Sequence, residues 1–401
     1  MTTDLNLITD PLVNGLVVEA SAGTGKTYSV AALVARELAT REDLRIGDIL
    51  ITTFTRNAAA ELRDRVRARL VDTANQLRTG EVDANDLLAL HLAAQTEQVP
   101  SFIKRLERAA VEFDQSTIST IHSVCTKVLK TAGIEIVSDG DDDITKRIIA
   151  EAVNDQVVVE ALAGRVWDEG PIAELVAQML GDPYVEPWYD DSLDKKLSQQ
   201  LDDLVEMLRS CVQRVHLAMS THPSYNDLLR RAHEVVTDPS QDSLLQELRS
   251  RYSLAIVDEA QDTDTLQWKF FRALFPENDR RALVAVGDPK QAIYGFRGAD
   301  VRAYVRFSQQ ATRRTLTTNH RSDKPILEAL NTTFAAASFG PTISYIQVSA
   351  SERHETSQIV GTPPVEFINV GDITNQGQLA RPAAQKVLEL LTTAKLNPGN
   401  P

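Results

Sequence analysis

A short segment near the N-terminus has the residue types and the spacing of a phosphate-binding loop. It follows the apolar run 16–18 and consists of small and polar residues: Ala20, Ser21, Ala22, Gly23, Thr24, Gly25, Lys26 and Thr27. Small residues let backbone N–H groups curl around an anion, and glycine tolerates the dihedral angles that such a turn needs. Lys26 would supply a charge for the β- and γ-phosphates of a nucleotide, and the Thr27 hydroxyl would ligate Mg²⁺.

This loop departs from the general pattern at one position, because Ala20 stands where the first glycine is expected. The alternative interpretation is a strand-to-helix turn with a solvated lysine. A second site far along the chain argues against it, since Asp258 and Glu259 end the apolar run 254–257. In phosphoryl transfer to water, the first acid would hold Mg²⁺ and the second would polarise the attacking water.

Apolar runs alternate with helical patterns, which predicts an α/β fold with a mainly parallel sheet. Strands are expected at about 16–18, 49–53, 117–122, 254–258, 282–286, 315–322, 343–348 and 365–370. Helices are expected at about 27–38, 123–130, 324–334 and 383–391. Ligands of parallel sheets bind beyond the carboxyl ends of the strands. The following candidate side chains each follow a strand, so we expect them to share one site or adjoining sites: Lys26, Thr55, His122, Asp258, Gln291 and Arg321.

Composition limits the kinds of partner and location that fit the chain. Its 401 residues are enough for two or three domains, and 43% hydrophobic with 24% charged residues is ordinary for a globular protein. The formal net charge of −14 argues against gripping nucleic acid by bulk charge, so any DNA contact must be local. Two cysteines outside any metal-type cluster, no basic leader and no long apolar run together predict a cytoplasmic protein without a membrane span.

Aromatic residues placed directly after strands are candidates for stacking on nucleobases. Phe54 follows the strand 49–53, and Tyr294 and Phe296 lie in the polar loop after the strand 282–286. The alternative for these rings is simple packing. His122 could touch a nucleic-acid backbone, although a single histidine at a strand end is more often a local hydrogen-bonding residue. Four arginines lie on the helical segment after 54–57, and a solvated helix face explains them as well as a functional role does: Arg63, Arg65, Arg67 and Arg69.

As an ordered set, six segments resemble the N-terminal part of UvrD/RecB-type superfamily 1 DNA helicases, and the phosphate loop is most similar to that of RecB. The segments are 20–27, 53–62, 119–129, 257–262, 287–300 and 316–322. The resemblance implies an ATP-dependent motor of recombination and repair, in which two RecA-like lobes close on ATP and move 3′ to 5′ along single-stranded DNA. Lys26 and Thr27 would then serve the phosphates and Mg²⁺, Asp258 would bind Mg²⁺, and Glu259 would be the catalytic base.

The resemblance also assigns the remaining candidates. Gln291 resembles a sensor of the γ-phosphate, and Arg321 resembles the arginine that contacts this phosphate from the second lobe. His320 stands where the family usually has a larger aromatic that stacks on adenine, Phe296 stands where tryptophan is frequent, and no glutamine precedes the loop. The positions that would line the DNA track or join it to the nucleotide site are Phe54, Thr55, Thr120, His122, Tyr294, Phe296 and Arg297.

The resemblance divides the chain into regions. It implies a first motor lobe formed by 1–132 and 251–313, with a helical insertion at about 71–112, a helical subdomain at 133–250, and the start of a second lobe at 314–401. The later family motifs and the RecB nuclease domain are absent from the sequence. The alternative is therefore a truncated ATP- and DNA-binding module that does not unwind DNA on its own. RecC- and RecD-like subunits are candidate partners.

Overall fold

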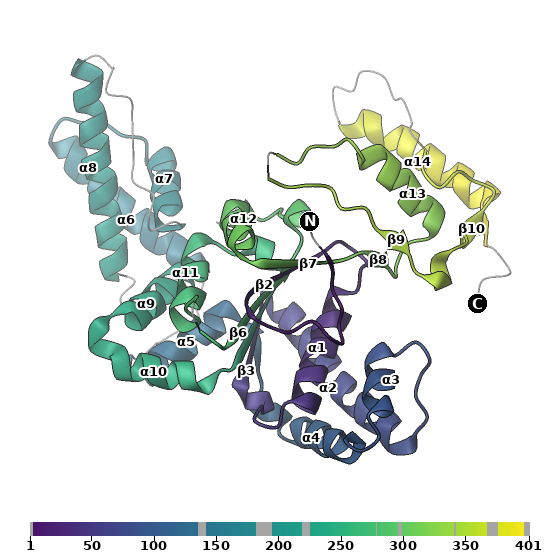
Figure 1. Ribbon diagram of the computed structural model, residues 1–401. Helices are drawn as coiled ribbons and strands as arrows, with labels where there is room; N and C mark the ends of the chain where they lie inside the picture. Colours follow the sequence, from purple (N-terminus) through teal and green to yellow (C-terminus); the bar gives the residue numbers. More distant parts are fainter. Residues whose placement is uncertain are drawn as a thin grey trace.

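A seven-stranded sheet forms the centre of the protein, whose computed structural model describes residues 3–134, 142–181, 195–218, 225–277, 279–295, 299–340, 342–366 and 376–396. The strand order is β1-β7-β2-β6-β5-β3-β4, and every neighbouring pair is parallel (Figure 1). The strands are β1 (Thr3–Asp4), β2 (Asn14–Ala20), β3 (Ile49–Thr53), β4 (Thr117–Thr120), β5 (Leu254–Asp258), β6 (Ala282–Gly287) and β7 (Thr312–Leu316). The α/β fold with a parallel sheet that the sequence predicts is confirmed.

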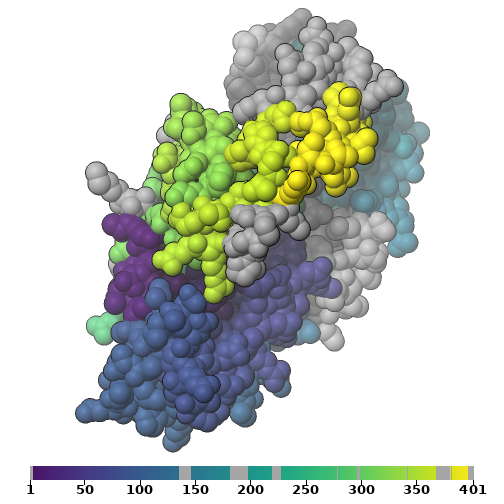
Figure 2. Space-filling view, turned by 90° about the vertical axis from the view of Figure 1, so that its right-hand side faces the viewer, coloured from purple at the N-terminus to yellow at the C-terminus, as the bar shows by residue number. Residues whose placement is uncertain are grey.

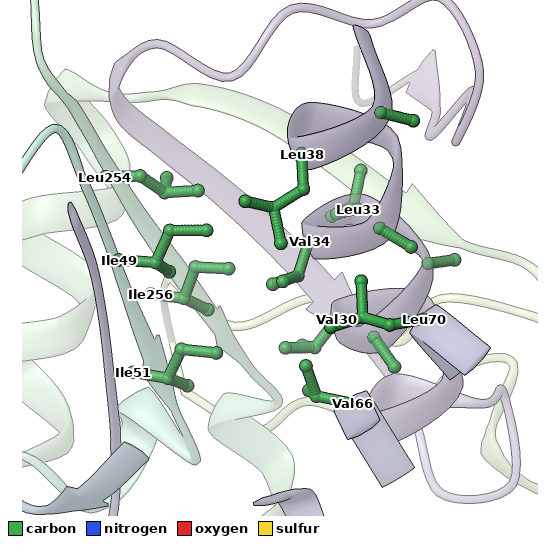
Figure 3. Packing of buried hydrophobic residues seen from close by; sticks show 14 of the residues in the cluster. Val30, Leu33, Val34, Leu38, Ile49, Ile51, Val66, Leu70, Leu254 and Ile256 are labelled. Atoms are coloured by element: carbon green, nitrogen blue, oxygen red, sulfur yellow. The ribbon is translucent and has the colours of Figure 1, made fainter. Parts of the chain in front are cut away.

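Helices cover both faces of this sheet. One face carries α1 (Lys26–Thr40), α2 (Arg56–Thr79) and α4 (Val99–Val111), and the other carries α5 (Ile121–Thr131), α9 (Tyr225–Thr237), α11 (Thr265–Leu274) and α12 (Val301–Gln310). In Figure 3, Val34 of α1 points toward Ile49 of β3 and Ile256 of β5, whereas the adjacent Leu50 and Ala255 belong to the core of the opposite face. Because both faces are buried, the strands are near-continuous apolar runs. Polar side chains therefore gather mainly at the strand ends.

Three helices between β4 and β5 form a separate arm with a hydrophobic core of its own. They are α6 (Asp142–Leu162), α7 (Glu169–Gly181) and α8 (Lys195–Ala218), and Figure 1 shows them extending away from the sheet. By contrast, α9 and α10 (Asp242–Arg251) contribute Leu229, Val236 and Leu248 to the core that covers the sheet. The part of the predicted subdomain 133–250 that has an independent core is thus confined to the arm.

The chain leaves the main sheet after β7. It forms two small sheets, in which β8 (Thr318–Asn319) pairs with β9 (Ser349–Ala350) and β10 (Ile359–Val360) pairs with β11 (Lys395–Leu396). They are accompanied by α13 (Lys324–Phe334) and α14 (Gln376–Thr393). Figures 1 and 2 both place these green-to-yellow elements above the N-terminal helices, among which lies α3 (Leu87–Ala94).

The structure differs from the sequence prediction in this C-terminal part. The segment 343–348 is not a strand, because it finds no hydrogen-bonded partner strand among the described residues and β9 follows it. Residues 367–370 of the other expected strand lie outside the described residues. Strand β7 joins the main sheet, which therefore includes residues up to Leu316, beyond the expected boundary at 313. No helix in the described ranges has both the length and the apolar character needed to cross a membrane.

Candidate nucleotide and nucleic-acid site

The predicted phosphate loop connects the end of β2 to the start of α1. Helix α1 begins at Lys26, one residue before the predicted start. Gly23 and Gly25 both have a φ of 82°, a left-handed conformation that residues with a Cβ avoid. The loop is braced internally, because the hydroxyl of Thr24 donates to the carbonyl of Ser21 over 2.8 Å. The N-terminus of α1 faces the loop, so its exposed N–H groups and helix dipole favour an anion at this point.

The loop lysine meets the acidic pair that follows β5. Lys26 Nζ donates to Glu259 Oε2 over 2.7 Å, although the two residues lie 233 positions apart in the sequence. Strand β6 separates β2 from β5 in the sheet, and all three strands point the same way. Lys26, Asp258 and Glu259 therefore share the carboxyl edge of the sheet, as the sequence predicted.

Asp258 is almost fully buried and carries little compensation for its charge. Only 8% of the residue is exposed, and its Oδ1 accepts the backbone N–H of Glu259 over 3.0 Å. Burial, followed by the nearby negative charge of Glu259, raises the pKa of Asp258 to about 6, although Lys26 opposes the shift. A buried carboxylate of this kind fits a divalent cation, because a cation would supply the missing compensation.

Glu259 has a strained backbone conformation, and its side chain is held by a residue that the sequence reasoning missed. Its φ of 51° is the only positive φ of a non-glycine residue in the described ranges. Gln261 Nε2 donates to Glu259 Oε2 over 2.8 Å, and Gln261 Oε1 accepts the backbone N–H of Asp288 over 3.0 Å. A Cβ at Gly287 would lie 2.5 Å from Gln261 Oε1, so only glycine fits there. Gln261 thus ties the acidic pair to the loop that follows β6.

That loop carries Gln291 and is anchored by buried charges. Gln291 Nε2 donates to Asp288 Oδ2 over 2.8 Å, and Lys290 Nζ lies 2.7 Å from Asp288 Oδ1. The same lysine lies 3.4 Å from Glu19 Oε1, and Arg313 lies 2.9 Å from Glu19 Oε2. A set of contacts therefore leads from Glu259 through Gln261 to the loop with Gln291, and from there to the strands β2 and β7.

His320 and Arg321 lie beside the phosphate loop, on the segment that leaves the main sheet. The His320 backbone N–H donates to the Gly23 carbonyl over 2.8 Å, and Arg321 Cβ lies 3.0 Å from the position that a Cβ at Gly23 would take. A Cβ at Gly25 would lie 3.8 Å from His320 Cδ2 and 3.9 Å from Tyr28 Cβ. Tyr28 is 46% exposed. The sequence reasoning missed it, although an aromatic directly after the Lys-Thr pair was the available signal.

The Tyr28 ring packs against an arginine that belongs to a buried ion pair. The Arg69 guanidinium carbon lies 5.2 Å from the centroid of the Tyr28 ring. Arg69 binds Asp86 through two hydrogen bonds of 2.6 and 2.7 Å. Of the other arginines on α2, Arg63 donates to the Ile118 carbonyl, whereas Arg65 pairs with a neighbouring glutamate at the surface. The solvated-face interpretation therefore fits Arg65 but not Arg69.

The predicted stacking residues lie at the same edge of the sheet. Phe54 and Tyr294 stack on each other, with ring centroids 4.9 Å apart and an interplanar angle of 24°. Thr55 caps α2 by accepting the Ala58 N–H over 3.1 Å, and Thr120 caps α5 by accepting the Ser123 N–H over 3.4 Å. The caps give both threonines a structural role. The two remaining candidates of this loop, Phe296 and Arg297, lie outside the described residues.

His122 lies in the first turn of α5 and not at the end of a strand, which corrects the predicted strand 117–122. The strand stops at Thr120 because that residue turns its hydroxyl to cap the helix. Burial lowers the pKa of His122 to about 4, so its ring is neutral at neutral pH. The ring would therefore meet a nucleic acid as a hydrogen-bonding group and not as a cation.

Comparison with known proteins relates this arrangement to DNA helicases. The N-terminal domain of the UvrD/REP helicases matches residues 1–312. The chain is 32% identical over 361 residues to the RecBCD enzyme subunit RecB of Mycobacterium tuberculosis strain H37Rv, covering 87% of this chain and 32% of that protein. It is 33% identical over 362 residues to RecB of Mycolicibacterium smegmatis, with 86% and 32% covered.

A further relative is the ATP-dependent DNA helicase UvrD2 of Mycobacterium bovis, which is 26% identical over 353 residues. That alignment covers 83% of this chain and 45% of the relative. The chain spans about a third of the length of the RecB relatives that it matches.

Proposed function

The chain belongs to the UvrD/REP helicase family, and on that premise we propose that it hydrolyses ATP to move 3′ to 5′ along single-stranded DNA. The contact between Lys26 and Glu259 carries this proposal, because it brings the phosphate-binding lysine and the candidate base to one point. The parallel sheet and its flanking helices have the arrangement of a RecA-like core with a phosphate loop.

The triphosphate would lie in the loop 20–27, with backbone N–H groups and the N-terminus of α1 around it. A phosphate there would compete with Glu259 for Lys26, since the lysine already lies within 2.7 Å of the carboxylate. Drawing Lys26 toward the phosphates would leave Glu259 to accept a proton from the attacking water. The nucleobase would lie between Tyr28 and His320, the two side chains nearest Gly25 on the exposed side of the loop.

The Thr27 hydroxyl and the Asp258 carboxylate are the side chains that would hold Mg²⁺. Mg²⁺ is commonly bound by one or two protein oxygens together with phosphate oxygens, so a complete protein cage is not required. When bound, the ion neutralises charge on the β- and γ-phosphate oxygens. Arg321 would place a positive charge near the γ-phosphate from the segment after β7. Gln291 would contact the γ-phosphate and so couple its presence to the position of the loop that also carries Tyr294.

Single-stranded DNA would cross the edge of the sheet formed by Phe54, Thr55, Thr120, His122 and Tyr294, with Phe296 and Arg297 as further candidates. A base that stacks on an aromatic ring gains about 1–3 kcal/mol without bulk positive charge. Stacking therefore reconciles DNA binding with a net charge of −14. The Phe54–Tyr294 pair supports this route, because it brings aromatic side chains that follow β3 and β6 together at one edge of the sheet.

We propose that the first motor lobe comprises the main sheet and its helices through β7, and that the second lobe begins with β8. The RecB relatives carry the name of a subunit of the RecBCD enzyme, so RecC- and RecD-like partners and a role in recombination and repair are part of the proposal. A second candidate is a module that binds ATP and DNA without unwinding. It is favoured by the described residues after Leu316, which form two-stranded sheets and no second large sheet.

A DNA-stimulated ATPase assay tests the proposal. ATP turnover by the chain is measured with and without single-stranded oligonucleotide, and strand separation is measured on duplexes with a 3′ or a 5′ tail. The motor predicts stimulated hydrolysis and unwinding of the 3′-tailed duplex alone. Nucleotide and DNA binding without stimulated hydrolysis would favour the binding module, and failure to bind single-stranded DNA would refute both.

A further inference from the structure

The side chain of Asn319 joins the phosphate loop to the segment that carries Arg321. Its Nδ2 donates to the Ala22 carbonyl over 2.9 Å. Its Oδ1 accepts the backbone N–H groups of Arg321 and Ser322, each over 2.9 Å. Only 3% of Asn319 is exposed, so these bonds are shielded from water. One buried amide thus holds both the loop and the turn with the candidate arginine.

The bond to Ala22 matters because a phosphate loop must turn its carbonyl groups away from the anion. A carbonyl oxygen that faced a phosphate would repel it, whereas the N–H groups attract it. The Ser21 and Gly25 carbonyls accept local donors, from Thr24 and from Ser29 of α1. Two of the three carbonyls between them, those of Ala22 and Gly23, accept donors from Asn319 and from the His320 backbone, nearly 300 positions along the chain.

The packing at Gly23 shows how closely the amide approaches the loop. A Cβ at this glycine would lie 2.7 Å from Asn319 Nδ2 and 2.9 Å from Asn319 Oδ1. A methyl group there would force the amide and the loop apart. Gly23 is therefore required both for its left-handed φ of 82° and for this contact.

We infer that Asn319 is a positioning residue for the triphosphate, which keeps the loop in its anion-binding form and makes the loop and the Arg321 turn move together. The inference rests on the proposed binding of ATP at this loop. It differs from a purely structural role, because Asn319 contacts the loop backbone through one donor while its acceptor serves a different segment. The two contacts can therefore be separated by substitution.

Asn319→Asp removes the donor to Ala22 and keeps an acceptor for Arg321 and Ser322. It also places a carboxylate against the Ala22 carbonyl. A matched control is Asn331→Asp, because Asn331 also donates through Nδ2 to a backbone carbonyl, that of Val348, over 2.9 Å, away from the loop. Both variants carry the same change of charge, so the control shows what a new carboxylate does away from the loop. Asn319→Ala removes the donor to Ala22 without adding a charge and separates the lost contact from repulsion of the phosphates.

The affinity of the full chain for a fluorescent ATP analogue is measured first. We expect Asn319→Asp to bind it roughly 5- to 30-fold more weakly than wild type, the range for a lost buried hydrogen bond. Asn331→Asp should bind it within twofold of wild type. Amide hydrogen exchange of residues 20–27, measured without nucleotide, should be faster in Asn319→Asp than in the control.

Unchanged analogue affinity together with unchanged loop exchange in Asn319→Asp would overturn the inference. If that variant does not fold, Asn319→Ala is put through the same two comparisons. Failure of the proposed function has a different signature, namely absent DNA-stimulated hydrolysis in the wild-type chain. The exchange measurement reports on Asn319 in either case, because it needs no nucleotide.

Discussion

Gln261→Glu is the substitution that most directly tests how the candidate base is held. The change keeps the size of the side chain and keeps an acceptor for the Asp288 N–H, but it replaces the donor to Glu259 by an acceptor. A hydrogen bond to a charged group contributes about 1.5–3 kcal/mol. If losing this hydrogen bond raises the activation free energy for hydrolysis by the same amount, kcat should fall roughly 10- to 150-fold. The KM for ATP should change little, because Gln261 does not touch the phosphate loop.

The assay is steady-state ATP hydrolysis at saturating single-stranded DNA, with kcat and KM determined separately. Gln76→Glu is the matched control, since Gln76 likewise donates to a carboxylate, that of Asp86, and accepts a backbone N–H, that of Asp83. The control should lose comparable stability and retain its kcat, and any effect that passes through the Arg69–Asp86 pair to Tyr28 should appear in the KM for ATP. A Gln261→Glu enzyme with wild-type kcat, or one whose defect lies only in KM, would refute the proposed orientation of Glu259.

Four further substitutions test the rest of the site. Lys26→Ala should abolish both ATP turnover and ATP binding, whereas Glu259→Gln should abolish turnover and still bind ATP. Nucleotide-binding and hydrolysis assays distinguish the two variants. Residual hydrolysis in Glu259→Gln would exclude Glu259 as the base. Phe54→Ala should weaken binding of single-stranded DNA roughly 5- to 150-fold by fluorescence anisotropy, the loss expected for one stacked base, and unchanged affinity would leave the ring a packing role. Because the pKa of His122 is lowered to about 4, its unfolded form binds more protons between pH 4 and 6.5, so the stability it contributes is present above pH 6.5 and lost as the pH falls. His122→Gln should reduce the change in the free energy of unfolding between pH 4 and 6.5 by roughly 3 kcal/mol, as measured by denaturant unfolding at each pH. If the free energy of unfolding of the variant depended on pH as in wild type, the burial argument would be contradicted.

The sequence predicts the sheet and the acid–lysine pairing because both depend on local patterns. Buried parallel strands are apolar runs, and the side chains that follow them must meet at one edge. The predicted helix 324–334 also agrees with α13 (Lys324–Phe334). The segment 343–348 is also rich in apolar residues, but it has no partner strand in the part of the chain that the structure describes, and partners cannot be read from local patterns. In the same way, helix periodicity cannot tell that α9 and α10 pack on the main sheet while α6, α7 and α8 form an arm.

Two of the residues that sequence reasoning missed act through contacts between segments that are distant in the sequence. Gln261 and Asn319 are ordinary amides in the sequence, and their importance follows from the Asp288 N–H and the Ala22 carbonyl that they meet in the fold. Thr55 and Thr120 each cap a helix, a structural role that the resemblance did not assign to them. Roles for such residues need coordinates as well as motifs.

The pairing of Lys26 with Glu259 suggests why hydrolysis would wait for a bound nucleotide. In the structure Glu259 Oε2 accepts a hydrogen bond from Lys26 Nζ at 2.7 Å, so this oxygen is occupied by the lysine and not by a water. A triphosphate carries several negative charges and would compete for the same lysine. As Lys26 turned toward the phosphates, Glu259 Oε2 would lose this donor and could accept one from the attacking water, while Gln261 kept the side chain oriented. The same lysine would thus couple occupancy of the loop to activation of the water, without any change in the sheet that holds both.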